Sequence, residues 1–138
     1  MKTQRVETWV AAIKDKPGGL AAKLKTLAAG GVNLEFIIAR RAPDKPGTGV
    51  VFITPVKGPK QTRAAKAAGF RSTKKLHTVR IEGADRPGLG ARITGMLAGQ
   101  GLNLRGLSAA AIGKKFVCHI AVDSEIAANK AVRILRSL

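Results

Sequence analysis

Two stretches of this sequence match each other without a gap. They read KDKPGGLAAKLKTLAAGGVNLEF (residues 14–36) and ADRPGLGARITGMLAGQGLNLRG (residues 84–106). The identical positions, at a constant offset of 70 residues, are Asp15, Pro17, Gly18, Ala21, Leu27, Ala28, Gly31, Asn33 and Leu34 in the first copy. Repetition at a fixed period indicates a repeated structural unit. We therefore predict two copies of one fold.

Each copy begins with an Asp-basic-Pro-Gly turn that leads into a helix. Asp15 is the expected helix cap, and Pro17 is expected near the first helical turn, where its missing N–H costs nothing. Leu20, Leu24 and Leu27 follow at helical spacing. Glycine then precedes Asn33, and glycine is the residue that most often ends a helix. The repeat thus predicts a turn, a helix and the start of a strand.

The segments around the repeats complete each unit. In the first copy, strands are predicted over residues 5–13, 33–41, 50–56 and 71–75, with a second helix over 59–70. In the second copy, strands are predicted over 76–83, 102–112 and 115–122, with a last helix over 124–138 capped by Ser124. The chain stops there, so the second unit lacks a final strand, which leaves a sheet edge for another segment to cover.

Strand–helix–strand–strand–helix–strand is the ferredoxin-like βαββαβ plan. We predict an α+β protein with antiparallel sheets that carry helices on one face. The two domains span residues 1–74 and 75–138. The open face of the first sheet would carry Val6, Val10 and Ala12, and an apolar open face predicts burial against another sheet or subunit. We therefore expect a homodimer.

Charge is the unusual feature of the composition. The 138 residues include 25 Lys and Arg against 8 Asp and Glu, a formal net charge of +17. Such a balance attracts polyanions, acidic protein surfaces and small anions. Aromatic residues are only 4% of the chain, which disfavours binding of single strands by stacking. No long apolar run or signal peptide is visible, so we expect a cytoplasmic protein that does not enter the membrane.

The repeated turn, helix and Gly-x-Asn-Leu sequence resembles the ACT domain family, small regulatory modules that bind amino acids beside metabolic enzymes. The resemblance covers nearly the whole chain as two tandem copies. It implies that a ligand lies where the turn of one domain meets the second strand of a neighbouring domain. The site residues that this implies are Asp15, Lys16, Pro17, Gly18, Gly19 and Leu20 with Asn33, and Asp85, Arg86, Pro87, Gly88, Leu89 and Gly90 with Asn103.

The chemistry of these residues suits a free amino acid. Unpaired N–H groups at a helix start favour a carboxylate, and glycine lets a ligand approach the backbone closely. The Asn33 and Asn103 side chains offer a carbonyl and an amide. Asp15 or Asp85 could pair with the ammonium group, and Lys16 or Arg86 adds positive charge. The same residues also suit a purely structural turn and helix stop.

No catalytic constellation is visible, so we predict a non-enzymatic protein without cofactor or metal. His77 and His119 lie on predicted strands, and their positions in the other copy are not histidines. Cys118 alternates with Phe116, Ile120 and Val122, which indicates a buried small hydrophobe. The sequence therefore predicts an amino-acid sensor or regulator, with a partner enzyme as its target.

Two alternative functions stay open at this stage. The first is nucleic-acid binding, because no acidic residue occurs between Asp44 and Glu82. In that stretch Lys60, Arg63 and Lys66 recur at helical spacing. The second is an interaction subunit that has lost its ligand sites and docks on an acidic enzyme.

Overall fold

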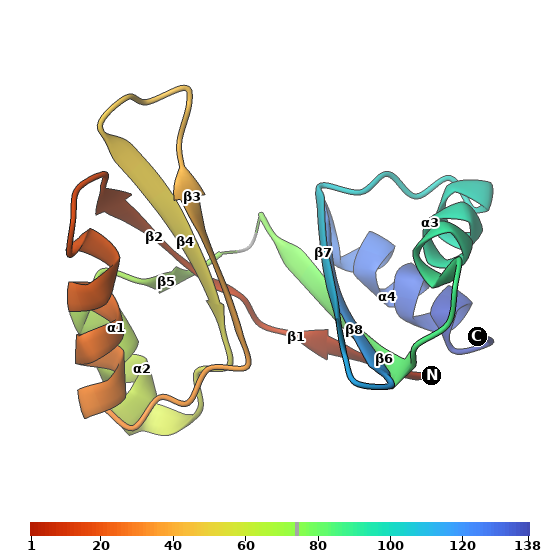
Figure 1. Ribbon diagram of the computed structural model, residues 1–138, viewed down its shortest axis with the longest axis horizontal. Helices are drawn as coiled ribbons and strands as arrows, with labels where there is room; N and C mark the ends of the chain where they lie inside the picture. The colour runs from red at the N-terminus through yellow and green to blue at the C-terminus, as the bar shows by residue number, and fades with distance from the viewer. Residues whose placement is uncertain (74) are drawn as a thin grey trace. The chain divides into compact units, whose positions relative to one another are not determined.

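The computed structural model describes residues 1–73 and 75–138, which form two compact units (Figure 1). One is built from Glu7–Thr73, and we call it the continuous unit. The other joins Met1–Val6 to Lys74–Leu138, and we call it the composite unit. Each unit holds a four-stranded antiparallel sheet. The fold class is therefore α+β, as predicted. No helix in the described residues is long and apolar enough to cross a membrane.

The continuous unit follows the predicted order of elements. They are β2 (Trp9–Lys14), α1 (Gly19–Ala29), β3 (Phe36–Arg41), β4 (Thr48–Thr54), α2 (Gly58–Ala67) and β5 (Arg71–Ser72). The sheet order is β3-β4-β2-β5. The last strand is shorter than the predicted 71–75, of which residue 74 lies outside the described residues. Both helices cover one face of the sheet (Figure 1).

The composite unit contains β6 (His77–Ala84), α3 (Leu89–Gly99), β7 (Gly106–Ile112), β8 (Lys115–Val122) and α4 (Glu125–Leu135). Its sheet order is β1-β6-β8-β7, in which β1 is Lys2–Val6 from the start of the chain. The predicted cap of α4 is confirmed, because the Ser124 hydroxyl accepts a hydrogen bond of 3.1 Å from the Ala127 N–H.

The N-terminal strand differs from the prediction. We expected one strand over residues 5–13 in the first unit. Residues 7–8 belong to no strand, and the strands on either side of them, β1 and β2, join different sheets. β1 pairs with β6, from Lys2 opposite Glu82 to Val6 opposite Thr78. No strand follows α4 in the described residues 136–138, as predicted, and β1 occupies the edge of the sheet instead. Residues 1–6 therefore belong to the second sheet rather than to a domain spanning 1–74.

Each sheet packs its helix-covered face into a separate core. In the continuous unit the core contains Trp9, Leu27, Val51, Ile53 and Phe70. In the composite unit it contains Val79, Ile81, Ile93, Leu97, Cys118, Ile120, Val132 and Leu135, with the Met1 side chain packed against it. The Met1 ammonium also donates a hydrogen bond of 2.9 Å to the Leu138 carbonyl oxygen, so both ends of the chain are fixed in this unit.

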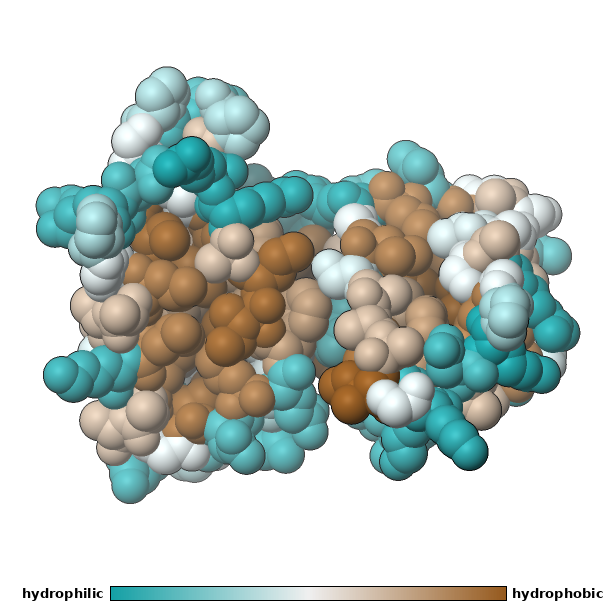
Figure 2. All heavy atoms as spheres, in the orientation of Figure 1, coloured by the Kyte–Doolittle hydropathy of each residue, from teal (hydrophilic) through white to brown (hydrophobic). Residues whose placement is uncertain are grey.

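The uncovered faces of the two sheets differ in character. In the continuous unit that face is apolar, since the cross-strand register places Val10 opposite Phe52 and Phe52 opposite Ile38. Figure 2 shows apolar side chains gathered over this unit. Val10 and Ala12 lie on this face as predicted, but Val6 belongs to the other sheet.

The uncovered face of the composite unit mixes polar and apolar side chains instead, since Glu82 lies opposite Val117 and Val117 lies opposite Ala110. Arg80 lies opposite His119, which lies opposite Ser108. Arg80 also forms an ion pair with Glu82. The hydrogen bond and positive charge of Arg80 hold the pKa of the Glu82 carboxyl below its usual value.

The thiol of Cys118 is expected to be inert in the folded protein. The side chain is 1% exposed, and burial raises its pKa to about 11. Because the thiolate is the nucleophile, at pH 8 the native protein should react with an aromatic disulfide reagent far more slowly than the urea-unfolded chain. Equal rates in the two states, followed by absorbance, would contradict the placement of Cys118 in the core.

Candidate ligand-binding turns

The predicted turns begin both first helices, but their caps are not the aspartates. Gly18 and Gly88 occupy the N-cap positions of α1 and α3, with φ of 82° and 78°. Residues with a side chain rarely adopt this left-handed conformation. Asp15 and Asp85 lie three residues before these glycines, so the expected aspartate cap is wrong. Pro17 and Pro87 precede the caps rather than entering the first turn.

The first turns of α1 and α3 keep backbone donors open. The N–H of Gly19 bonds to the Lys16 carbonyl, and the N–H of Leu89 bonds to the Arg86 carbonyl. These bonds fold the turn itself. Both helices lie within the described residues, and no N-cap side chain there accepts a hydrogen bond from either helix. The following N–H groups of each helix therefore face outward with the positive end of the helix dipole, an arrangement that suits a carboxylate.

Glycine is needed at Gly19 for structural reasons, but not at Gly90. A Cβ atom on Gly19 would lie 2.5 Å from the Lys14 carbonyl oxygen, so the backbone itself demands glycine there. A Cβ atom on Gly90 would meet nothing within 4 Å, and its φ is not positive. The corresponding position in the first copy is Leu20, which is packed against the core. Only the second copy thus leaves the backbone bare at this position.

The two aspartates also differ in their surroundings. Arg41, at the end of β3, forms an ion pair of 2.8 Å between its Nε and the Asp15 Oδ2. The N–H of Asp15 bonds to the Gly47 carbonyl in the loop that follows. In the second copy, the N–H of Asp85 donates a hydrogen bond to the Lys114 carbonyl oxygen. The strand position that corresponds to Arg41 is occupied by Ala111. Among the described residues, no ion pair involves Asp85.

Asn33 and Asn103 lie at the opposite end of the first helix of each unit. Both follow the helix and precede the next strand, and both are exposed. Each helix has 11 residues, which corresponds to a length of about 16 Å. A single unit therefore does not bring its own turn and its own asparagine together.

The remaining predicted residues divide between surface and core. Lys16, Pro17, Arg86 and Pro87 are exposed beside their turns. Leu89 is 4% exposed and packs in the composite core, so its side chain faces away from the turn. Sequence reasoning missed Arg41, because the register of the β3–β4 hairpin places it beside Asp15.

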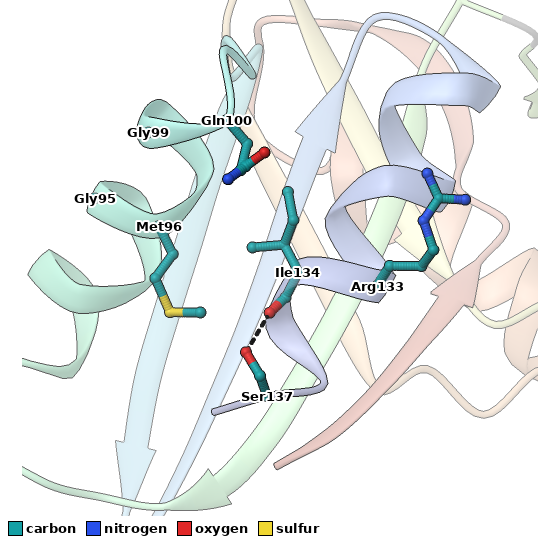
Figure 3. Close-up of a pocket in the computed structure, with 7 residues that line it drawn as sticks. All are labelled: Gly95, Met96, Gly99, Gln100, Arg133, Ile134 and Ser137. Carbon is teal, nitrogen blue, oxygen red and sulfur yellow. Dashed lines mark hydrogen bonds between the residues drawn. The ribbon is translucent and has the colours of Figure 1, made fainter.

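A surface groove of about 450 Å³ lies between α3 and α4 (Figure 3). Its walls come from Gly95, Met96, Gly99, Gln100, Arg133, Ile134 and Ser137. The Ser137 hydroxyl donates a hydrogen bond of 2.9 Å to the Ile134 carbonyl at its edge. None of the predicted ligand residues lines this groove. In the described part of the chain, no three His, Cys, Asp or Glu side chains gather as metal ligands.

Comparison with solved structures places this arrangement among known folds. Protein BT0572 from Bacteroides thetaiotaomicron superimposes with a TM-score of 0.78 at 18% identity, over 98% of this chain and 89% of that one. The ligand-free regulatory subunit of aspartate kinase from Thermus thermophilus gives a TM-score of 0.67 at 17% identity, over 99% and 94%. The chain has the tandem ACT-domain fold. The match to aspartokinase alpha and beta subunits has a TM-score of 0.64 at 21% identity.

Neither the family models nor the curated proteins include a match to this sequence. The structural matches extend over almost the whole chain. They therefore extend over both units. At these identities the likeness concerns the fold, and the function has to be argued from the residues themselves.

Proposed function

We propose that this tandem ACT protein is a non-catalytic regulator that binds a free amino acid. The carboxylate of the ligand is bound by the first-turn N–H groups of α1 or α3. Asn33 or Asn103 from a neighbouring unit donates a hydrogen bond to the ligand carboxylate through its side-chain amide. Its side-chain carbonyl oxygen accepts one from the ligand ammonium group. The observation that carries this proposal is the pair of helix starts with a left-handed glycine and no side-chain cap.

The turn of the second copy is the better site of the two. Asp85 has no ion pair in the described structure and can meet the ammonium group of the ligand, whereas Asp15 is bound to Arg41. Gly90 leaves the backbone of α3 open to close approach, and the first copy has Leu20 at this position. Arg86 adds a positive charge beside the carboxylate. We therefore assign ligand binding first to Asp85–Gly90.

A ligand that contacts a turn and an asparagine must bridge two units, because the two groups lie about 16 Å apart along one helix. The second unit can come from the same chain or from a second copy. Such a ligand favours the arrangement of units that it bridges, so the affinity of the protein for a partner enzyme changes with ligand concentration.

Substitution of Gly90 tests the assigned turn. Gly90→Ala should weaken amino-acid binding at least tenfold, because the new Cβ atom occupies the space where the ligand meets the backbone. The same change should stabilise α3 by about 0.8 kcal/mol, the helix preference of Ala over Gly. Calorimetric titration measures the first effect, and thermal unfolding measures the second.

Gly95→Ala is the matched control for that experiment. Gly95 lies in the same helix, and a Cβ atom there also meets nothing within 4 Å. The control should gain similar stability and keep the affinity of the unsubstituted protein. Equal affinity for the amino acid in both variants would show that the ligand does not bind at the α3 turn. Asn103→Ala and Asn33→Ala then identify which asparagine completes the site, and unchanged affinity in both would reject the asparagines.

A further inference from the structure

The solvent-exposed face of α2 carries only basic charged groups. Ala65 and Ala68 turn the opposite face into the core. With 100° between successive helical residues, Lys60, Arg63 and Lys66 fall around the centre of the outer face, and all are exposed. Lys57 precedes this row and Arg71 follows it, both also exposed. We call these five residues the basic ridge.

The helix that carries the basic ridge is fixed at both ends. The Gln61 side chain accepts a hydrogen bond of 2.8 Å from the Lys57 N–H and donates one of 2.9 Å to the Gly31 carbonyl. At the other end, the Lys23 ammonium donates a hydrogen bond of 2.5 Å to the Ala68 carbonyl. Gly30 and Ala64 allow close approach, since a Cβ atom on Gly30 would lie 2.2 Å from that of Ala64. The ridge is therefore displayed on a rigid element.

The charges of the basic ridge oppose the stability of their own helix. α2 has no acidic residue in its first turn, and Lys57 and Lys60 place positive charge at the end where the helix dipole is already positive. Lys60, Arg63 and Lys66 also repel one another at a spacing of three residues. None of the ion pairs in the described residues involves a member of the ridge.

The counterpart helix shows that the fold does not require such a face. α4 occupies the same place in the composite unit, but it begins with a Ser124 cap and Glu125 in its first turn. Its exposed side mixes Ile126 and Asn129 with a single exposed cation, Arg133. A local arrangement that conflicts with helix electrostatics in one copy alone points to a function of that surface.

We propose that the basic ridge is a docking surface for double-stranded nucleic acid. Protein interfaces are anchored by buried apolar and aromatic side chains, and the ridge offers only Pro59 and Ala67 beside its cations. Single strands are bound by aromatic stacking, and α2 carries no aromatic residue. Contacts to the phosphates of a duplex need positive charge alone. This activity is separate from amino-acid binding.

The geometry of the ridge sets the expected salt dependence. From Lys57 to Lys66 the helix rises by about 14 Å, a span that faces several phosphates of one duplex. If five cations each neutralise one phosphate, log K should fall against log salt concentration with a slope of about −4.5. Removal of three of the cations should make the slope shallower by about 2.7, at about 0.9 for each contact.

The experiment is titration of a fluorescein-labelled duplex with the protein over a series of KCl concentrations. The duplex has about 20 base pairs, which makes it several times longer than the ridge. The Lys60→Ala/Arg63→Ala/Lys66→Ala variant should lose at least tenfold in affinity and show the shallower slope. The control Arg92→Ala/Arg133→Ala/Arg136→Ala removes the same charge from exposed helix positions of the composite unit. It should change the slope by less than about 1, because these residues lie outside the ridge.

Three outcomes would overturn the proposal. Equal losses in the two triple variants would show that overall charge, rather than the ridge, attracts the duplex. A salt-independent affinity would exclude phosphate contacts. Binding of polyglutamate with the same affinity and the same sensitivity to the ridge variant would assign the surface to an acidic protein. Thermal unfolding of each variant verifies the fold, and an unchanged response to free amino acids separates this test from the proposed regulatory function.

Discussion

Residues 75–138 alone should fail to fold, and the same fragment should fold when residues 1–6 are attached to its C-terminus. β1 contributes a five-residue ladder to β6, and Met1 packs on the core. An antiparallel ladder of this length averages about one hydrogen bond of about 1 kcal/mol for each residue pair, so loss of this segment, with the partly buried Met1 side chain, costs at least roughly 5 kcal/mol. That is close to the whole stability of a small domain.

The attachment is feasible because the two ends of the chain already meet. The Met1 ammonium lies 2.9 Å from the Leu138 carbonyl oxygen, so a flexible linker of about four residues, which can span more than 12 Å, is long enough. The control carries six Gly and Ser residues in place of residues 1–6. Circular dichroism should show a cooperative transition only with the native segment. A cooperative transition in the bare fragment would contradict the role of β1.

Ile93→Ala should be the most damaging of the single substitutions considered. Ile93 has no exposed surface and packs from α3 into the composite core. Truncation of a buried isoleucine leaves a cavity and costs about 3 kcal/mol, which lowers the unfolding midpoint of a unit of this size by roughly 12 to 24 °C. Thermal unfolding monitored by circular dichroism measures the shift.

Ile126 provides a control with the same chemistry. It lies in α4 of the same unit but is 80% exposed. Ile126→Ala should change stability by no more than about 0.5 kcal/mol. Comparable shifts for the two substitutions would mean that α3 does not pack as described.

The sequence predicted the elements that depend on residue patterns within a short stretch of chain. The repeat revealed both turns, both first helices and the hairpins, and Ser124 was identified as a cap from its place before an amphipathic helix. The pairing of β1 with β6 joins residues about 80 positions apart, such as Lys2 and Glu82. No glycine or proline marks the break at Glu7 and Thr8, so one continuous strand fitted the alternating pattern equally well.

The sequence predicted which residues form the two turns, but it did not predict how the two turns differ from each other. A repeat makes the two turns look equivalent, and the aspartates look like helix caps. The left-handed glycines move the helix starts three residues onward. The register of the β3–β4 hairpin places Arg41 on Asp15, and the second copy has a small residue there. Such contacts depend on tertiary register, which a single sequence does not display.

The most direct test of the regulatory proposal is a thermal-unfolding screen of the intact chain against the twenty amino acids at fixed salt. A ligand at a hundred times its dissociation constant should stabilise the native state by about 2.7 kcal/mol. We predict a clear upward shift with one or a few amino acids, reduced in Gly90→Ala and retained in Gly95→Ala. No shift with any of the twenty would contradict amino-acid binding by this protein.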